Sequence, residues 1–61
     1  MYAKYVKLRD SKGMTDAEVS RLSGVPKSTF TDWKSGRSNP KIEKLIKITN
    51  ALGVTIEDFI K

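Results

Sequence analysis

Five side chains within residues 27–34 can each donate or accept hydrogen bonds, and each is short or flexible. At helical spacing they share one outward face that could enter a groove, and they are Lys27, Ser28, Thr31, Asp32 and Lys34. Their chemistry is recognition by hydrogen bonding. The chain has no His and no Cys, which excludes thiol chemistry, disulfides and zinc fingers. No arrangement of residues indicates an enzyme, and none calls for a metal or a cofactor.

The element that would position this face is a pair of short helices joined by a tight turn, predicted at residues 16–34. Thr15 and Glu18 have the spacing of a capping box, which starts the first helix at residue 16. Gly24 supplies the left-handed backbone conformation of the turn. Pro26 has no N–H to lose and opens the second helix. This arrangement is a helix-turn-helix, whose second helix enters the major groove of DNA.

The apolar spacing fits two helices that cross at a steep angle. Four apolar side chains lie where the helices would touch: Val19, Val25, Phe30 and Trp33. Ser20 lies where the helices approach most closely, and this position needs a small side chain. Phe30 and Trp33 are three residues apart on one helix face. They are therefore predicted to be core residues, which leaves no exposed aromatic platform for stacking on single-stranded bases.

The rest of the chain is predicted to add three helices and no strand. The first spans residues 2–12, another spans 41–52, and a short one follows a cap at Thr55. A wide apolar stripe is expected on the helix at 41–52, formed by Ile42, Leu45, Ile46, Ile48, Thr49 and Leu52. The fold class is therefore all-α with five short helices, in a single domain over residues 1–61.

The charge of the chain is basic and unevenly placed. The formal net charge is +5, and residues 27–47 hold six basic and two acidic side chains. An excess of positive charge on the second helix and the segment after it favours an anionic partner. No apolar run is long enough to span a membrane, and no signal peptide is visible. We expect a cytoplasmic protein with no small-molecule substrate.

Three segments resemble the Cro/repressor (Xre-like) family of helix-turn-helix proteins. They are KGMT at 12–15, SGVPKSTFTDWKSGRSNP at 23–40 and IEKLIKITNALGVTIEDFI at 42–60. The joint spacing of the three segments is specific, and the similarity runs from about Tyr5 to Ile60. The resemblance implies a lambda-repressor-like fold and sequence-specific binding of double-stranded DNA.

The resemblance also implies which side chains meet the bases. The expected base-reading residues are Lys27, Ser28, Thr31 and Asp32. Lys27 could donate to guanine O6 and N7, and Asp32 could accept from cytosine N4. Asp32 could equally pair with a neighbouring lysine, and the sequence leaves both roles open.

A second set is expected to contact the DNA backbone. In the family, the loop after the recognition helix runs along the phosphates, and the first helix of the motif points its N-terminus at one. The corresponding residues here are Thr15, Lys34, Ser35, Arg37, Ser38, Asn39 and Lys41.

Two positions depart from the family pattern. Asp16 stands where the family commonly has a glutamine that bonds a phosphate, and its charge would repel that phosphate. Lys34 stands where the family often has a glutamate paired with the arginine found here as Arg9. That pair cannot form, so we expect Arg9 to be solvated rather than bound to a phosphate.

The C-terminal helix is expected to contribute to a homodimer on DNA. The residues implied by the resemblance are Ile56, Phe59 and Ile60, although most of this apolar group is expected to pack in the core. Two subunits would place their recognition helices in two half-sites of an inverted repeat, about 34 Å apart.

The implied function is a transcriptional repressor of phage or prophage type. It would occupy an operator, exclude polymerase, and reside at the nucleoid of a bacterial or phage-infected cell. The alternative is a protein-interaction module of the same fold, such as an antitoxin or a phage regulator that binds a protein.

Overall fold

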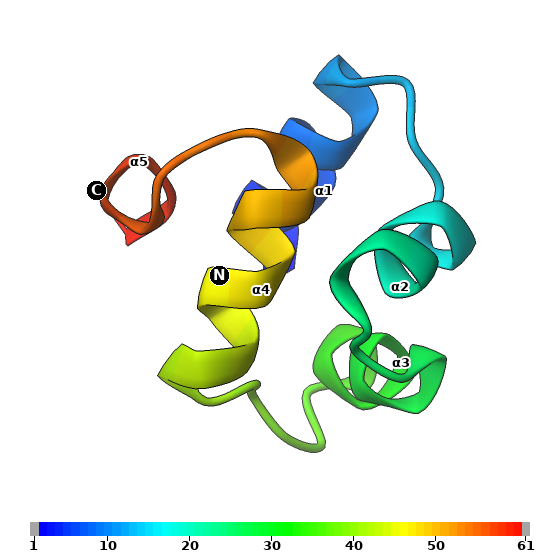
Figure 1. Ribbon diagram of the computed structural model, residues 1–61. Helices are drawn as coiled ribbons and strands as arrows, with labels where there is room; N and C mark the ends of the chain where they lie inside the picture. The colour runs from blue at the N-terminus through cyan, green and yellow to red at the C-terminus, as the bar shows by residue number, and fades with distance from the viewer. Residues whose placement is uncertain (1, 61) are drawn as a thin grey trace.

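Five α-helices make up the computed structural model, which describes residues 2–60. In chain order they are α1 (Tyr2–Ser11), α2 (Asp16–Ser23), α3 (Lys27–Ser35), α4 (Ile42–Leu52) and α5 (Ile56–Ile60). Figure 1 shows α4 at the centre, between α2 and α5, with α3 beside α2. The described residues form no strand. The predicted all-α fold with five helices is confirmed. None of these helices is long and apolar enough to cross a bilayer.

The start of α2 carries the predicted capping box. The Thr15 hydroxyl oxygen accepts from the Glu18 backbone N–H at 3.2 Å, and the Glu18 carboxylate accepts from the Thr15 N–H at 3.3 Å. α2 ends at Gly24, whose φ is +77° and whose N–H donates to the Ser20 carbonyl at 2.9 Å. Any side chain would strain that conformation, so Gly24 fixes where α2 ends.

The turn between α2 and α3 is held by one polar and one apolar side chain. The Ser20 hydroxyl donates to the Val25 carbonyl at 2.6 Å, and Val25 is buried. The sequence predicts a small residue at position 20 because the two helices approach closely there. The hydrogen bond gives a second reason for a serine at this position, because it satisfies the Val25 carbonyl, which has no helical partner.

Aromatic rings from three helices form the centre of the core. The Tyr5 ring of α1 stacks on Trp33 of α3 with centroids 5.1 Å apart, and it lies 5.4 Å from Phe30. Trp33 also lies 6.0 Å from Phe59 of α5. All four residues are buried, which confirms Phe30 and Trp33 as core residues. The rings therefore fix the inner face of α3.

The apolar stripe of α4 is narrower than predicted. Four of its residues are buried, Leu45, Ile48, Thr49 and Leu52. Ile42 and Ile46, however, are 55% and 42% exposed. They lie one turn apart on the shoulder of the stripe, which the neighbouring helices do not cover. The predicted wide stripe is therefore only partly buried, and Ile42 and Ile46 form its exposed edge.

The C-terminal helix divides its apolar residues between core and surface. Phe59 is 1% exposed and packs against Trp33, whereas Ile60 is 56% exposed. Ile56 is half-buried and packs against the core. Phe59, expected at a dimer contact, therefore has no side-chain surface to offer to a second subunit.

Candidate nucleic-acid interface

The outward face of α3 is polar because its inner face is occupied by the buried aromatic residues. Lys27, Ser28 and Thr31 are exposed, and Asp32 is half-buried. The Thr31 hydroxyl turns back onto the helix and donates to the Lys27 carbonyl at 3.3 Å. Its methyl group is then the part of the side chain free to meet a partner. The nearest cation to Asp32 is not a lysine but Arg37, with Nη1 4.0 Å from the carboxylate.

A groove joins this face to the loop that follows α3. Its volume is about 560 Å³, and its lining residues come from α3, the loop and the start of α4: Ser28, Thr29, Asp32, Ser38, Asn39, Pro40, Lys41 and Lys44. The groove thus brings together two of the predicted base-reading residues and three of the predicted backbone-contacting residues. Sequence reasoning missed Lys44. It lies three residues after Lys41, and that helical spacing could have indicated it.

The loop residues in this groove are free to bind a partner. The side chains of Ser38, Asn39 and Lys41 are exposed and form no hydrogen bond with any other part of residues 2–60. Arg37, just outside the groove, is 80% exposed. Pro40 is buried and anchors the loop before α4 begins. The arrangement presents cations and neutral donors together, as phosphate binding requires.

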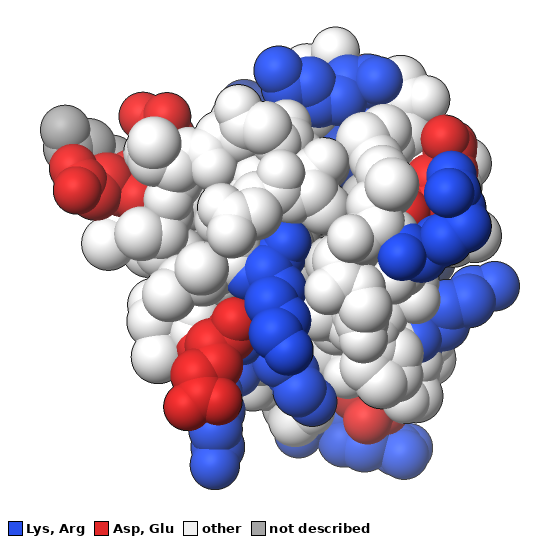
Figure 2. Space-filling view, viewed as in Figure 1, with Lys and Arg blue, Asp and Glu red and all other residues white. Residues whose placement is uncertain are grey.

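Charged side chains of both signs are spread over the molecule. Figure 2 shows basic side chains along the lower edge of the view, where α3 and the start of α4 lie in Figure 1, and further basic side chains at the top and at the right. Acidic side chains appear at the upper left, over α5, which carries Glu57 and Asp58, and also at the lower left and at the right. The groove itself is lined by two lysines, Lys41 and Lys44, and by one carboxylate, that of Asp32.

Two predicted backbone contacts have their hydroxyl groups already engaged. Thr15 Oγ1 belongs to the capping box of α2. Ser35 Oγ donates to the Asp32 carbonyl at 3.0 Å. Lys34 is exposed on the last turn of α3. A phosphate at the start of α2 would also meet Glu18 and Asp16, the acidic residues of its first turn.

Arg9 is not solvated, and this expectation was wrong. Its side chain is 19% exposed, and Nη1 donates to Asp16 Oδ1 at 2.8 Å. A second carboxylate, that of Asp10, accepts from Nη2 at 3.0 Å and from Nε at 3.1 Å. The Tyr5 hydroxyl also donates to Asp16 Oδ1, at 2.6 Å. The ion pair between Arg9 and Asp16 forms because Asp16, at the start of α2, lies within reach of the last turn of α1.

These contacts shift the ionisation of all three side chains. Burial alone would raise the pKa of Asp16, but the hydrogen bonds from Tyr5 and Arg9 and the charges of Arg9 and Lys34 outweigh it and lower that pKa. Burial raises the pKa of Tyr5, and the Asp16 carboxylate raises it further. The hydrogen bond to Asp16 raises the pKa of Arg9. The ionic form of the Arg9–Asp16 pair is therefore the stable one.

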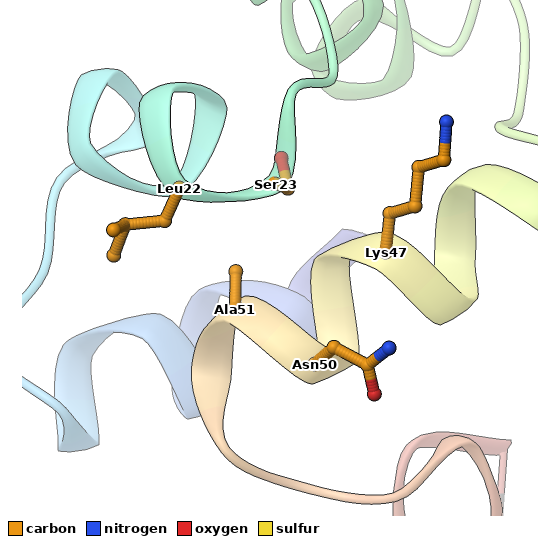
Figure 3. A pocket seen from close by; sticks show the side chains of 5 residues that line it. All are labelled: Leu22, Ser23, Lys47, Asn50 and Ala51. Carbon is orange, nitrogen blue, oxygen red and sulfur yellow. The ribbon is translucent and has the colours of Figure 1, made fainter.

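A second hollow lies between α2 and α4, away from the groove. Its volume is about 450 Å³, and Figure 3 shows its five lining side chains, Leu22, Ser23, Lys47, Asn50 and Ala51. None of the residues predicted to contact DNA lines it. Among residues 2–60, no three His, Cys, Asp or Glu side chains lie close enough together to hold a metal ion.

Two short helices joined through a left-handed glycine, with a polar outer face on the second, define the class of helix-turn-helix proteins. A sequence profile described as helix-turn-helix matches residues 7–59. The chain belongs to the Xre-like helix-turn-helix family.

Two relatives of this chain are bacterial. An uncharacterized HTH-type transcriptional regulator, y4dJ of Sinorhizobium fredii, is 34% identical over 53 residues, which cover 87% of this chain and 69% of the relative. An uncharacterized HTH-type transcriptional regulator of Haemophilus influenzae is 42% identical over 41 residues, which cover 67% of this chain. The match spans 17% of the length of that second relative.

Proposed function

We propose that this chain is a sequence-specific double-stranded DNA-binding regulator of transcription, with α3 in the major groove. The observation that carries the proposal is the groove between α3 and the following loop. The groove places hydrogen-bonding side chains of α3, those of Ser28, Thr29 and Asp32, beside Lys41 and Lys44. DNA needs both in one place, because phosphate contacts fix the register while base contacts select the sequence. The names of the relatives agree with this role.

Within this proposal the residues divide into two groups. Lys27 and Ser28, exposed on the first turn of α3, meet base edges together with Thr31 and Asp32. The phosphates are bound by the cations and neutral donors of the loop and the start of α4, which are Arg37, Ser38, Asn39, Lys41 and Lys44. Asp32 can accept from cytosine N4 while Arg37 remains at 4.0 Å, because the carboxylate has further acceptor sites.

The regulatory mechanism in this proposal is occupancy of an operator. A repressor of phage or prophage type that covers a promoter excludes polymerase without needing a cofactor or a small-molecule ligand. It would act in the cytoplasm at the nucleoid.

We also propose that two copies bind an inverted repeat as a homodimer. The support is three exposed apolar side chains, Ile42 and Ile46 on α4 and Ile60 on α5, which are 42–56% exposed. α4 and α5 are in contact, and exposed apolar groups of this kind mark association sites. The proposed dimer contact thus retains Ile60, gains two residues of α4 and loses Phe59.

The alternative is a protein-interaction module of the same fold. One observation favours it: Leu22 is 55% exposed at the rim of the α2–α4 hollow. A protein partner bound there would cover none of the groove residues.

Mapping by NMR separates the two functions. The ¹⁵N-labelled chain is titrated with a mixed-sequence duplex, and amide shift changes are followed residue by residue. DNA binding in the proposed orientation moves the amide signals of residues 27–32, 35–39 and 41 and leaves those of Leu22 and Asn50 in place. Shifts centred on Leu22 and Asn50 would overturn the proposed orientation on DNA, and no shift with any duplex would overturn DNA binding itself in favour of the alternative.

A further inference from the structure

Three charged side chains meet at the corner where α1 ends and α2 begins. Arg9 is held between Asp10 and Asp16, at 3.0 Å and 2.8 Å. Lys34, on the last turn of α3, adds a fourth charge, which helps to lower the pKa of Asp16. The two cations and two carboxylates cancel. This corner therefore adds no net positive charge beside the recognition helix, unlike the groove lined by Lys41 and Lys44.

The two carboxylates do not hold Arg9 equally firmly. Asp16 is fixed by the Tyr5 hydroxyl at 2.6 Å, and Tyr5 is fully buried and stacked on Trp33. The Asp10 side chain is 62% exposed, and within residues 2–60 no buried side chain donates a hydrogen bond to it. An exposed ion pair exchanges readily with water, whereas one tied to the core does not. Asp16 is therefore the group that sets the position of the guanidinium.

We propose that Asp16 is a positioning residue that holds Arg9 out of contact with DNA phosphate and so limits the affinity of the chain for DNA. This inference rests on the proposed function, because it matters only when α3 lies in the major groove. The α1–α2 corner flanks α3 through Lys34, so a phosphate passing α3 there meets a neutral cluster instead of a free arginine. Phosphate binding is then concentrated on the loop and the start of α4.

If Asp16 only stabilised the fold, its substitution would have a different effect on DNA binding from the one that we propose. If Asp16 served only to stabilise the fold, removing its charge would lower stability and leave DNA binding equal or weaker. If Asp16 restrains Arg9, removing its charge lowers stability but strengthens binding. The two properties then move in opposite directions.

The test compares Asp16→Asn with the matched control Asp10→Asn, which removes the same charge from the carboxylate that accepts two hydrogen bonds from Arg9. Dissociation constants for a mixed-sequence duplex are measured by fluorescence anisotropy over a range of salt, at a temperature where circular dichroism shows every variant folded. Asp16→Asn is expected to bind more tightly, with a salt slope steeper by about 0.9, the value of one added phosphate contact. Its advantage should then grow about threefold between roughly 200 mM and roughly 50 mM salt. Asp10→Asn should change the slope little.

Three results would overturn the inference: an unchanged slope, weaker binding by Asp16→Asn, or an equal gain in both variants, which would indicate net charge alone. The double variant Arg9→Ala with Asp16→Asn should return to the slope of the natural chain. If Asp16→Asn fails to fold, Arg9→Ala alone decides, since a shallower slope would show that Arg9 already binds phosphate. Failure of the natural chain to bind any duplex refutes the proposed function instead.

Discussion

Replacing Tyr5 with Phe removes one hydroxyl from the centre of the network and leaves the packing intact. The ring stays stacked on Trp33 at 5.1 Å and beside Phe30 at 5.4 Å, because neither contact involves the hydroxyl. The loss is the 2.6 Å hydrogen bond to Asp16. A hydrogen bond to a charged acceptor contributes about 1.5–3 kcal/mol. The Asp16 side chain is 33% exposed, so water replaces part of the bond and we expect the lower end, about 1.5 kcal/mol.

This loss should be visible as a lower melting temperature. In a chain of 61 residues each kcal/mol corresponds to roughly 4–8 °C, which predicts a fall of roughly 6–12 °C. Thermal unfolding followed by circular dichroism at neutral pH measures it. Tyr2→Phe is the matched control, since the Tyr2 ring also packs on Trp33, at 5.4 Å, but its hydroxyl has no partner within residues 2–60.

The same network makes stability depend on pH. Burial acts to raise the pKa of Asp16, but the hydrogen bonds from Tyr5 and Arg9 prevail and the pKa lies below its usual value. The stabilisation is therefore present above the unfolded pKa of about 3.9 and is lost as the pH falls through the native pKa. The difference between Tyr5→Phe and the natural chain should be constant from about pH 7 to about pH 5 and shrink below about pH 4. An unchanged melting temperature at neutral pH, or a deficit that stays constant while Asp16 becomes protonated at acidic pH, would refute this reasoning.

Four further substitutions and one control, Lys47→Ala, test the proposed interface. Lys27→Ala should cost roughly 1–3 kcal/mol on the best site and relax the sequence preference in competition binding; equal weakening on all duplexes would make Lys27 a phosphate contact. Arg37→Ala should weaken binding to every sequence and reduce the salt slope by about one unit, and an unchanged slope would remove it from the phosphate contacts. Lys44→Ala should reduce the slope likewise, whereas Lys47→Ala, one turn further on and outside the groove, should not; identical slopes would show that the groove does not bind the backbone. Ile46→Glu should abolish cooperative binding to a two-site duplex and leave half-site affinity unchanged, and persistent cooperativity would place the dimer contact elsewhere.

Local signals in the sequence were enough to predict the helix-turn-helix. The capping box at Thr15 and the left-handed Gly24 are set by residues a few positions apart, and the structure retains both. Phe30 and Trp33 were assigned to the core from their spacing on one helix. Each of these interactions depends on neighbours along the chain, which a sequence displays directly.

The features that escaped prediction depend on how the helices cross. Asp16 and Arg9 belong to different helices, and only the packing of α1 against the start of α2 brings them to 2.8 Å. Periodicity places Ile42 and Ile46 beside the buried stripe of α4, but the extent of the neighbouring helices decides whether they are covered. Lys44 was the exception, because its spacing of three residues from Lys41 could have indicated it before the groove was seen.

The most direct test of the account is selection from a random pool of duplexes at moderate salt, followed by sequencing of the retained DNA. We expect enrichment of an inverted repeat with half-sites about one helical turn apart, which two recognition helices reading bases would produce. Retention without enrichment would contradict base reading by α3 and leave only attraction by charge. No retention at all would contradict the DNA-binding function itself.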